Sequence, residues 1–187
     1  MLAATLSVVG CGSPEPAPEP APPVVIIETS MGVIKAELWA DAAPITVKNF
    51  LDYVDARHFD GLIFHRVMKG FMIQGGGLDP SMIERPSRMP IKNEASADKK
   101  NDRGTLAMAR TGVIDSATSE FYINLLDNDG LNHRDRTVEG FGYCAFGKVT
   151  EGMDVVDKIA EVPVAFIKGR QNVPATPVLI KSIRRAK

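Results

Sequence analysis

The chain has little of what metal-binding, disulfide-bonded or nucleic-acid-binding proteins depend on. It has only two cysteines in 187 residues, Cys11 and Cys144, and their surroundings differ so much that we expect no disulfide between them. Its three histidines lie far apart in sequence and suggest no metal site. A net charge of −1 gives no electrostatic reason to bind nucleic acid or an anionic membrane. What remains is an ordinary globular composition, with 44% apolar and 24% charged residues and enough length for one domain.

Motifs for phosphate binding and for nucleophilic catalysis are also missing. Residues 142–148 nearly fit a phosphate-binding loop, but Val149 stands where a Ser or Thr is needed and the intervening residues are apolar strand formers. Ser116 and Ser119 lack the context of a nucleophile elbow. Cys144 lies in an apolar run and is predicted to be an inert core thiol.

The first 23 residues differ from the rest of the chain. Residues 1–11 are apolar or small and end in Val-Val-Gly-Cys, which resembles the lipobox of bacterial lipoproteins, with Cys11 as the lipidated residue. No Lys or Arg precedes the apolar run, which indicates a truncated or wrongly assigned start; a frayed apolar N-terminus with a chance cysteine is the alternative. Residues 12–23 have proline at nearly every second position, as expected of an extended spacer or, alternatively, a proline-rich ligand.

Residues 24–187 are predicted to form one mainly β domain. Residues 24–29 and 33–39 flank a short turn and indicate a hairpin. Pro44 begins a helix with an apolar stripe, and Thr150 is expected to cap a second helix. With further strand-like runs and only two helices, the pattern favours an eight-stranded antiparallel closed β-barrel capped by two α-helices. The long segment 78–105 has no periodicity and no assigned role.

The most informative stretch is residues 64–77, where Arg66 and Gln74 lie among large apolar side chains. A guanidinium in an apolar setting must be paired within the protein or be kept for a ligand, because an unpaired buried charge costs several kcal/mol. We interpret Arg66 as kept for a ligand. The three glycines 75–77 precede no helix signal and indicate close backbone packing.

Five motifs, in this order and spacing, resemble those of cyclophilin-type peptidyl-prolyl isomerases. They are Phe64–Arg66, Gly70–Gly76, Ala107–Ala109, Ser119–Asn124 and Phe146–Val149. The resemblance runs from about Val24 to Lys187, and residues 90–95 and 103–105 resemble the exported bacterial branch in particular. It implies a barrel enzyme without cofactor or metal that acts as a monomer on proline-containing polypeptides. With the lipobox, it predicts a periplasmic lipoprotein attached to the membrane only through Cys11.

The resemblance also implies the site residues. Isomerisation of an X–Pro bond breaks no bond, so the enzyme must bind the twisted amide better than either planar form. Arg66 is the implied catalytic residue, as a permanently charged donor to the prolyl nitrogen. The implied substrate-binding residues are Phe71, Met72, Gln74, Ala109, Arg110, Glu120, Tyr122, Leu131 and Tyr143.

These nine residues have different implied roles. Phe71, Met72, Tyr122 and Leu131 would form the apolar pocket for the proline ring. Gln74 would orient Arg66 and hold a substrate carbonyl. The backbone at residues 109–110 would pair with the peptide as an added strand, and Tyr143 would cover the edge of the site.

Three positions depart from the family pattern. Tyr122 replaces a phenylalanine, and its hydroxyl needs a partner or an opening to water. Gly130 replaces an aromatic residue, which argues against strong binding of the inhibitor cyclosporin. Glu120 replaces a glutamine and is expected either to pair with Arg66 in the empty enzyme or to be a solvated carboxylate at the rim.

The predicted function is therefore isomerisation of X–Pro bonds during the folding of exported proteins. A tethered peptide-binding or chaperone module with little catalysis is the alternative. A cytoplasmic isomerase with a misassigned start codon is a third reading, and it predicts no lipid on Cys11.

Overall fold

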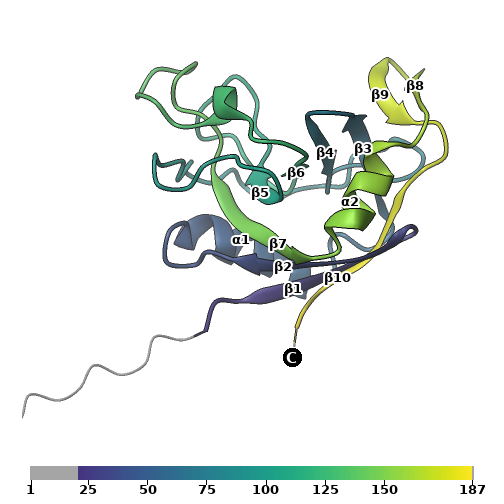
Figure 1. Cartoon of the computed structure of the whole chain (residues 1–187), viewed down its shortest axis with the longest axis horizontal. Coiled ribbons are helices and arrows are strands. Elements are labelled where there is room, and N and C mark those ends of the chain that lie inside the picture. Colours follow the sequence, from purple (N-terminus) through teal and green to yellow (C-terminus); the bar gives the residue numbers. More distant parts are fainter. Residues whose placement is uncertain (1–20, 187) are drawn as a thin grey trace, which may run out of the picture.

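The computed structural model describes residues 21–186, in which eight strands close into an antiparallel barrel in the order β1-β10-β3-β4-β6-β5-β7-β2 (Figure 1). These strands are β1 (Val24–Thr29), β2 (Gly32–Leu38), β3 (Leu62–Met68), β4 (Met72–Gly75), β5 (Thr105–Met108), β6 (Phe121–Asn124), β7 (Ala145–Glu151) and β10 (Leu179–Arg185). Two helices, α1 (Pro44–Asp55) and α2 (Met153–Ala160), pack on the barrel. The predicted mainly β class, with a closed eight-stranded barrel and two helices, is confirmed.

The predicted leader and its lipidation site at Cys11 lie outside the described residues, as does the spacer up to residue 20. Pro23, at the end of the spacer, accepts a hydrogen bond from the backbone N–H of Leu38 at 2.7 Å, so the chain joins the barrel there. None of the helices between residues 21 and 186 is both long and apolar enough to span a membrane.

The interior of the barrel is filled by aromatic rings. Phe50 of α1 lies with its ring centroid 5.4 Å from Phe121 on β6 and 5.1 Å from Phe146 on β7. On β6, Phe121 and Ile123 belong to this core, whereas Tyr122 belongs to a separate cluster, as the alternation of a strand requires. Because side chains pack the interior, the barrel is not a pore, and the cluster that contains Tyr122 lies outside this core.

The start of α2 differs from the prediction. Thr150 is not its cap: it lies in β7, where its hydroxyl donates to the carbonyl oxygen of Lys35 at 3.3 Å. Pairing between β7 and β2 continues to Glu151, and Gly152 then turns the chain directly into the helix with a φ of +87°. The left-handed conformation of the glycine therefore replaces a side-chain cap.

A second sheet, absent from the prediction, consists of β8 (Val164–Ile167) and β9 (Arg170–Pro174). This hairpin projects from the barrel, with β9 packed beside β3 (Figure 1). Its turn, Lys168-Gly169, has positive φ at both residues, which matches the twist of a two-residue hairpin. The pattern was missed because apolar residues such as Phe166 are exposed here, at 69%, so no alternation marks a buried face.

The long segment after β4 is anchored to α1. Ala43, before α1, offers no side-chain cap. Glu94 supplies one from the long segment, because its carboxylate accepts from the N–H groups of Ile45 at 3.1 Å and Thr46 at 2.7 Å. This contact holds the segment against the barrel and brings its last part, including Asn101, behind the candidate site.

Candidate active site

A cleft of about 230 Å³ on the outer face of the barrel collects most of the predicted site residues. It is lined by Arg66, Phe71, Met72, Gln74, Ala109, Arg110, Tyr122, Leu131 and Tyr143. The strands β3, β4, β6 and β5 are consecutive around the barrel, so residues that are distant in the sequence meet there (Figure 1). The tenth predicted residue, Glu120, lies beside this cleft and lines two neighbouring hollows.

Arg66 is held from one side only. It lies opposite Gln74 in the pairing of β3 with β4, and its Nη1 donates to Gln74 Oε1 at 3.2 Å. A guanidinium has five N–H donors, and that of Arg66 forms no other hydrogen bond and no ion pair with residues 21–186. Its charge is thus oriented by a neutral amide at the edge of the cleft, with no counter-ion among the residues that the structure describes.

Glu120 does not pair with Arg66, so that prediction was wrong. Its Oε2 accepts from Gln74 Nε2 at 2.7 Å and lies 3.5 Å from Nε2 of the buried His65. The Gln74 amide stands between the guanidinium and the carboxylate and bonds to both. Burial acts to raise the pKa of Glu120, but His65, the Gln74 donor and the charge of Arg170 together outweigh it and hold the pKa below its ordinary value. The carboxylate is therefore neither Arg66's direct partner nor a freely solvated rim group.

The floor of the cleft is buried and mostly apolar. Met72 on β4 and Tyr122 on β6 form a buried cluster with Ala107 and Ala145, and Phe71 and Leu131 pack at its edges. Met72 and Tyr122 point outward because they alternate with core residues on short strands whose opposite face fills the barrel. Such a surface suits a small apolar ring.

The hydroxyl of Tyr122 has a partner within the protein. It donates to Asn101 Oδ1 at 2.8 Å, and Asn101 is fully buried. Asn101 Nδ2 in turn donates to the carbonyl oxygens of Leu131 and Tyr143, each at 3.1 Å. Burial raises the pKa of Tyr122 well above its ordinary value, so the hydroxyl remains a neutral donor. One asparagine therefore joins the floor of the cleft to two of its walls.

Arg110 and Tyr143 form a single wall. The Arg110 guanidinium lies 4.7 Å from the centre of the Tyr143 ring. It donates to the carbonyl oxygens of Gly142 and Val138, each at 3.0 Å, and also to that of Thr111. The side chain of Arg110 thus braces the loop before β7.

The backbone beside this wall is partly available for pairing. Ala109 donates its N–H to the carbonyl oxygen of Glu120 at 2.9 Å, which occupies that group. The Ala109 C=O and the Arg110 N–H form no hydrogen bond with any described residue. These two groups, one acceptor and one donor, could pair with the backbone of an extended peptide in the cleft.

Two residues of this arrangement were not predicted. Asn101 lies in the segment for which the sequence suggested no role, and His65 was expected to be merely structural. The hydroxyl of Tyr122 indicated a need for either a polar partner or an opening to water, but it did not indicate where along the chain a partner would lie. No sequence signal pointed to the contact of His65 with Glu120.

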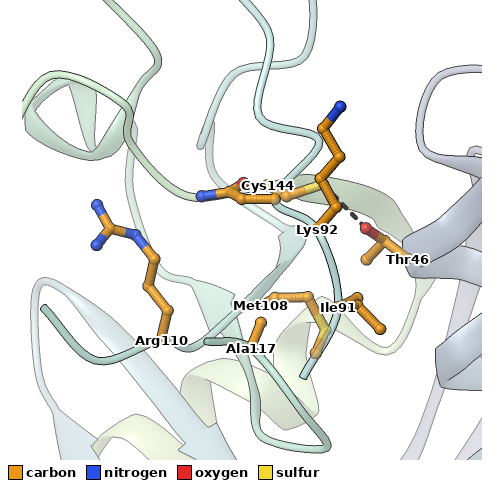
Figure 2. Close-up of a pocket in the computed structure, with 8 residues that line it drawn as sticks. Thr46, Ile91, Lys92, Met108, Arg110, Ala117 and Cys144 are labelled. Atoms are coloured by element: carbon orange, nitrogen blue, oxygen red, sulfur yellow. Dashed lines mark hydrogen bonds between the residues drawn. The ribbon is translucent and has the colours of Figure 1, made fainter. Parts of the chain in front are cut away.

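Cys144 is buried next to a small cavity lined by residues from α1, β5 and the long segment (Figure 2). At about 10 Å³ the cavity has room for one water molecule at most. Figure 2 shows the contact between the Cys144 Sγ and Thr46 Oγ1, which are 3.5 Å apart. Burial raises the pKa of the thiol to about 11, so it is protonated at neutral pH, as expected of an inert core cysteine.

The described histidines are dispersed. His58 packs against the Tyr53 ring with centroids 4.5 Å apart, and His133 Nδ1 lies 2.8 Å from the carbonyl oxygen of Phe141. Across residues 21–186, no group of three or more His, Cys, Asp or Glu residues has a geometry that could hold a metal ion.

Comparison with known proteins decides the family. The family model described as cyclophilin type peptidyl-prolyl cis-trans isomerase/CLD matches residues 24–185. The chain belongs to this family. It is 49% identical over 160 residues to peptidyl-prolyl cis-trans isomerase B of Escherichia coli (strain K12), covering 86% of this chain and 98% of that protein. It is 53% identical over 161 residues to a peptidyl-prolyl cis-trans isomerase of Acinetobacter baylyi, covering 86% and 84% of the two chains.

Solved structures agree with this assignment. A cyclophilin type peptidyl-prolyl cis-trans isomerase of Cryptosporidium parvum superimposes with a TM-score of 0.76 at 27% identity, over 88% of this chain and 98% of that one. The same protein in the presence of the dipeptide Ala-Pro gives a TM-score of 0.75. The protein is therefore a peptidyl-prolyl cis-trans isomerase, which confirms the predicted family and activity and argues against a module with little catalysis.

Proposed function

We propose that this isomerase lowers the barrier to rotation about X–Pro bonds by binding the twisted amide, with Arg66 donating to the prolyl nitrogen. Amide resonance sets that barrier at about 18–20 kcal/mol. The observation that supports the proposal most directly is the position of Arg66. It lies at the edge of an apolar cleft, anchored by Gln74 and with its remaining donors unused by the described residues.

The chemistry explains why such a donor would act on the transition state. In a planar amide the nitrogen lone pair is delocalised and accepts hydrogen bonds poorly. As the bond twists, the nitrogen becomes pyramidal and the lone pair becomes a good acceptor. An interaction that forms only in the twisted state lowers the barrier without tightening the ground state. A hydrogen bond to a charged group contributes about 1.5–3 kcal/mol, or about 10- to 150-fold in rate.

We propose that the floor of the cleft holds the proline ring and that the substrates are proline-containing polypeptides. Burial of each ring methylene against Met72 and Tyr122 would contribute about 0.8 kcal/mol to binding. The Ala109 C=O and Arg110 N–H would pair with the peptide backbone beside the ring. The Cryptosporidium parvum protein, studied in the presence of Ala-Pro, supports a proline-containing ligand for this fold.

Substitution of Arg66 tests this proposal. In an isomerisation assay on a proline peptide, we expect Arg66→Ala to lower kcat/KM about 10- to 100-fold, mainly through kcat, because the lost interaction belongs to the transition state. Arg66→Lys should recover only part of the loss, because an ammonium lacks the planar fork of the guanidinium.

Arg185→Ala is the matched control, since it removes an arginine that pairs with Asp55 at the end of α1 and does not line the cleft. Its activity should equal that of the wild type. Full activity of Arg66→Ala would refute the role proposed for Arg66.

We further propose that the isomerase is an exported monomer, attached to the membrane by a lipid on Cys11, that acts on exported polypeptides in the periplasm. The support is the sequence before residue 24: a lipobox-like ending at Cys11 followed by a proline-rich spacer. Mass spectrometry of the native N-terminus should find acyl chains on Cys11. An unmodified N-terminus would instead support a cytoplasmic isomerase, and size-exclusion chromatography tests the monomeric state.

A further inference from the structure

The side-chain amide of Gln74 lies between a group that can only donate hydrogen bonds and a group that can only accept them. A guanidinium can only donate hydrogen bonds, whereas an ionised carboxylate can only accept them. Gln74 presents Oε1 to Arg66 at 3.2 Å and Nε2 to Glu120 at 2.7 Å. A flipped amide would place its NH₂ against the guanidinium and its oxygen against the carboxylate, losing both hydrogen bonds. The carboxylate therefore selects the amide orientation that also holds Arg66.

Gly77 leaves room for the side chain of Glu120. A Cβ atom on Gly77 would lie only 2.7 Å from Glu120 Cγ, so the glycine provides the space that the carboxylate side chain occupies. The glycine is not required by its backbone, because Gly77 is not among the residues with positive φ. A glycine at position 77 therefore leaves the room that the Glu120 side chain needs.

A β-bulge supplies the second support for Glu120. Consecutive strand residues ordinarily point to opposite faces, but the register of β3 against β4 shifts between Phe64 and Arg66. As a result, His65 and Arg66 both reach the hollow that Glu120 lines, together with Arg170 from β9. His65 faces the carboxylate at 3.5 Å, and its Nδ1 is buried without a partner among the described residues. Among residues 21–186, the Glu120 carboxylate is thus the polar partner of the His65 ring.

We propose that Glu120 is a positioning residue for Arg66, acting through Gln74 by fixing the direction of its amide. This inference rests on the catalytic role proposed for Arg66, and it assigns Glu120 a task other than binding the substrate. With Glu120 in place, Arg66 is pre-oriented before the peptide arrives. Without a fixed acceptor, Gln74 samples both orientations, and Arg66 loses its anchor for part of the time. The cost should therefore fall on kcat rather than on KM.

A double-mutant cycle tests the proposal. Glu120→Gln keeps the shape but offers either end of an amide to Gln74, and we expect it to lower kcat about three- to tenfold with little change in KM. In a Gln74→Ala background the same substitution should change nothing further, because Glu120 then has no amide to direct. Losses that multiply in the double variant, or an unchanged kcat in Glu120→Gln, would overturn the proposal.

A spectroscopic measurement distinguishes positioning from general structural damage. The side-chain NH₂ resonances of Gln74 should shift in Glu120→Gln, since their acceptor changes from a carboxylate to an amide, while the backbone resonances of the barrel stay in place. Unchanged Gln74 resonances would contradict the proposal. Glu151→Gln on β7, which removes a carboxylate paired with Lys35, is the matched control and should leave kcat unchanged.

Gly77→Ala provides an independent route to the same effect. The added methyl group should displace the side chain of Glu120 and reproduce the loss of kcat, again only when Gln74 is present. A wild-type kcat in folded Gly77→Ala would count against the proposal. Arg66→Ala, assayed in parallel, separates the two hypotheses: if it keeps full activity, the proposed function fails. If it loses activity while Glu120→Gln does not, only the positioning role fails.

Discussion

Replacement of Tyr122 by phenylalanine isolates the hydrogen bond beneath the cleft. The ring would stay in the floor beside Met72, while the donor to Asn101 Oδ1 at 2.8 Å would be removed. Asn124 Nδ2, at 3.4 Å, is the other donor that Asn101 Oδ1 has among the described residues, and at that distance its bond is weak. The substitution therefore leaves a buried carbonyl oxygen poorly satisfied.

The structure sets the expected size of the effect. A neutral hydrogen bond contributes about 0.5–1.5 kcal/mol, and an unsatisfied buried acceptor costs about 1–3 kcal/mol. Because Asn124 compensates in part, we expect Tyr122→Phe to lower the free energy of unfolding by about 1–2 kcal/mol. For a domain of this size, that corresponds to a fall in Tm of about 2–8 °C. The walls remain tied to Asn101 through Leu131 and Tyr143, so kcat/KM should stay within about threefold of the wild type.

Thermal or urea unfolding, together with the peptide assay, measures both quantities. Tyr53→Phe is a matched control, because the Tyr53 hydroxyl is also buried and accepts from the Arg88 N–H at 2.7 Å, but on α1 away from the cleft. It should be destabilised by a similar amount with unchanged activity. Unaltered stability of Tyr122→Phe would show that the bond to Asn101 contributes nothing. A loss of activity beyond tenfold would show that the hydroxyl itself acts in the reaction.

Two further predictions concern Cys144 and Gly130. Folding raises the pKa of Cys144 from 9.0 to about 11, so between these values the unfolded chain releases a proton that the folded chain keeps. The free energy of unfolding should therefore fall by about 3 kcal/mol as the pH rises through this window, and Cys144→Ala should flatten the fall in urea unfolding; equal slopes in both proteins would contradict this. A Cβ on the exposed Gly130 meets nothing within 4 Å, so Gly130→Trp should fold normally and rebuild an aromatic wall. We expect it to strengthen cyclosporin inhibition about two- to tenfold, and an unchanged inhibition constant would contradict this.

Local sequence patterns were sufficient for much of the fold. The alternation of apolar residues predicted most strands, and Pro44 with the stripe that follows it predicted α1, because each of these signals depends on neighbours within a few positions. The hairpin β8–β9 was not predicted because local patterns assume that apolar residues are buried, and Phe166 is apolar but exposed. The prediction of Thr150 as a cap was wrong because β7 pairs with β2, which is distant in sequence, and this pairing keeps Thr150 in a strand.

Residue type and order were enough to predict the family, the barrel and the residues that line the cleft. Which of these residues are in contact depends on how the closed barrel brings them together. Arg66 and Glu120 are opposite charges whose direct pairing was a reasonable expectation, yet Gln74 lies between them and bonds to both. Asn101 had no sequence signal because its partners lie on other segments brought together by barrel closure. Hydrogen bonds depend on distances of a few tenths of an ångström, and these are set by the packing of the whole barrel rather than by neighbours in the chain.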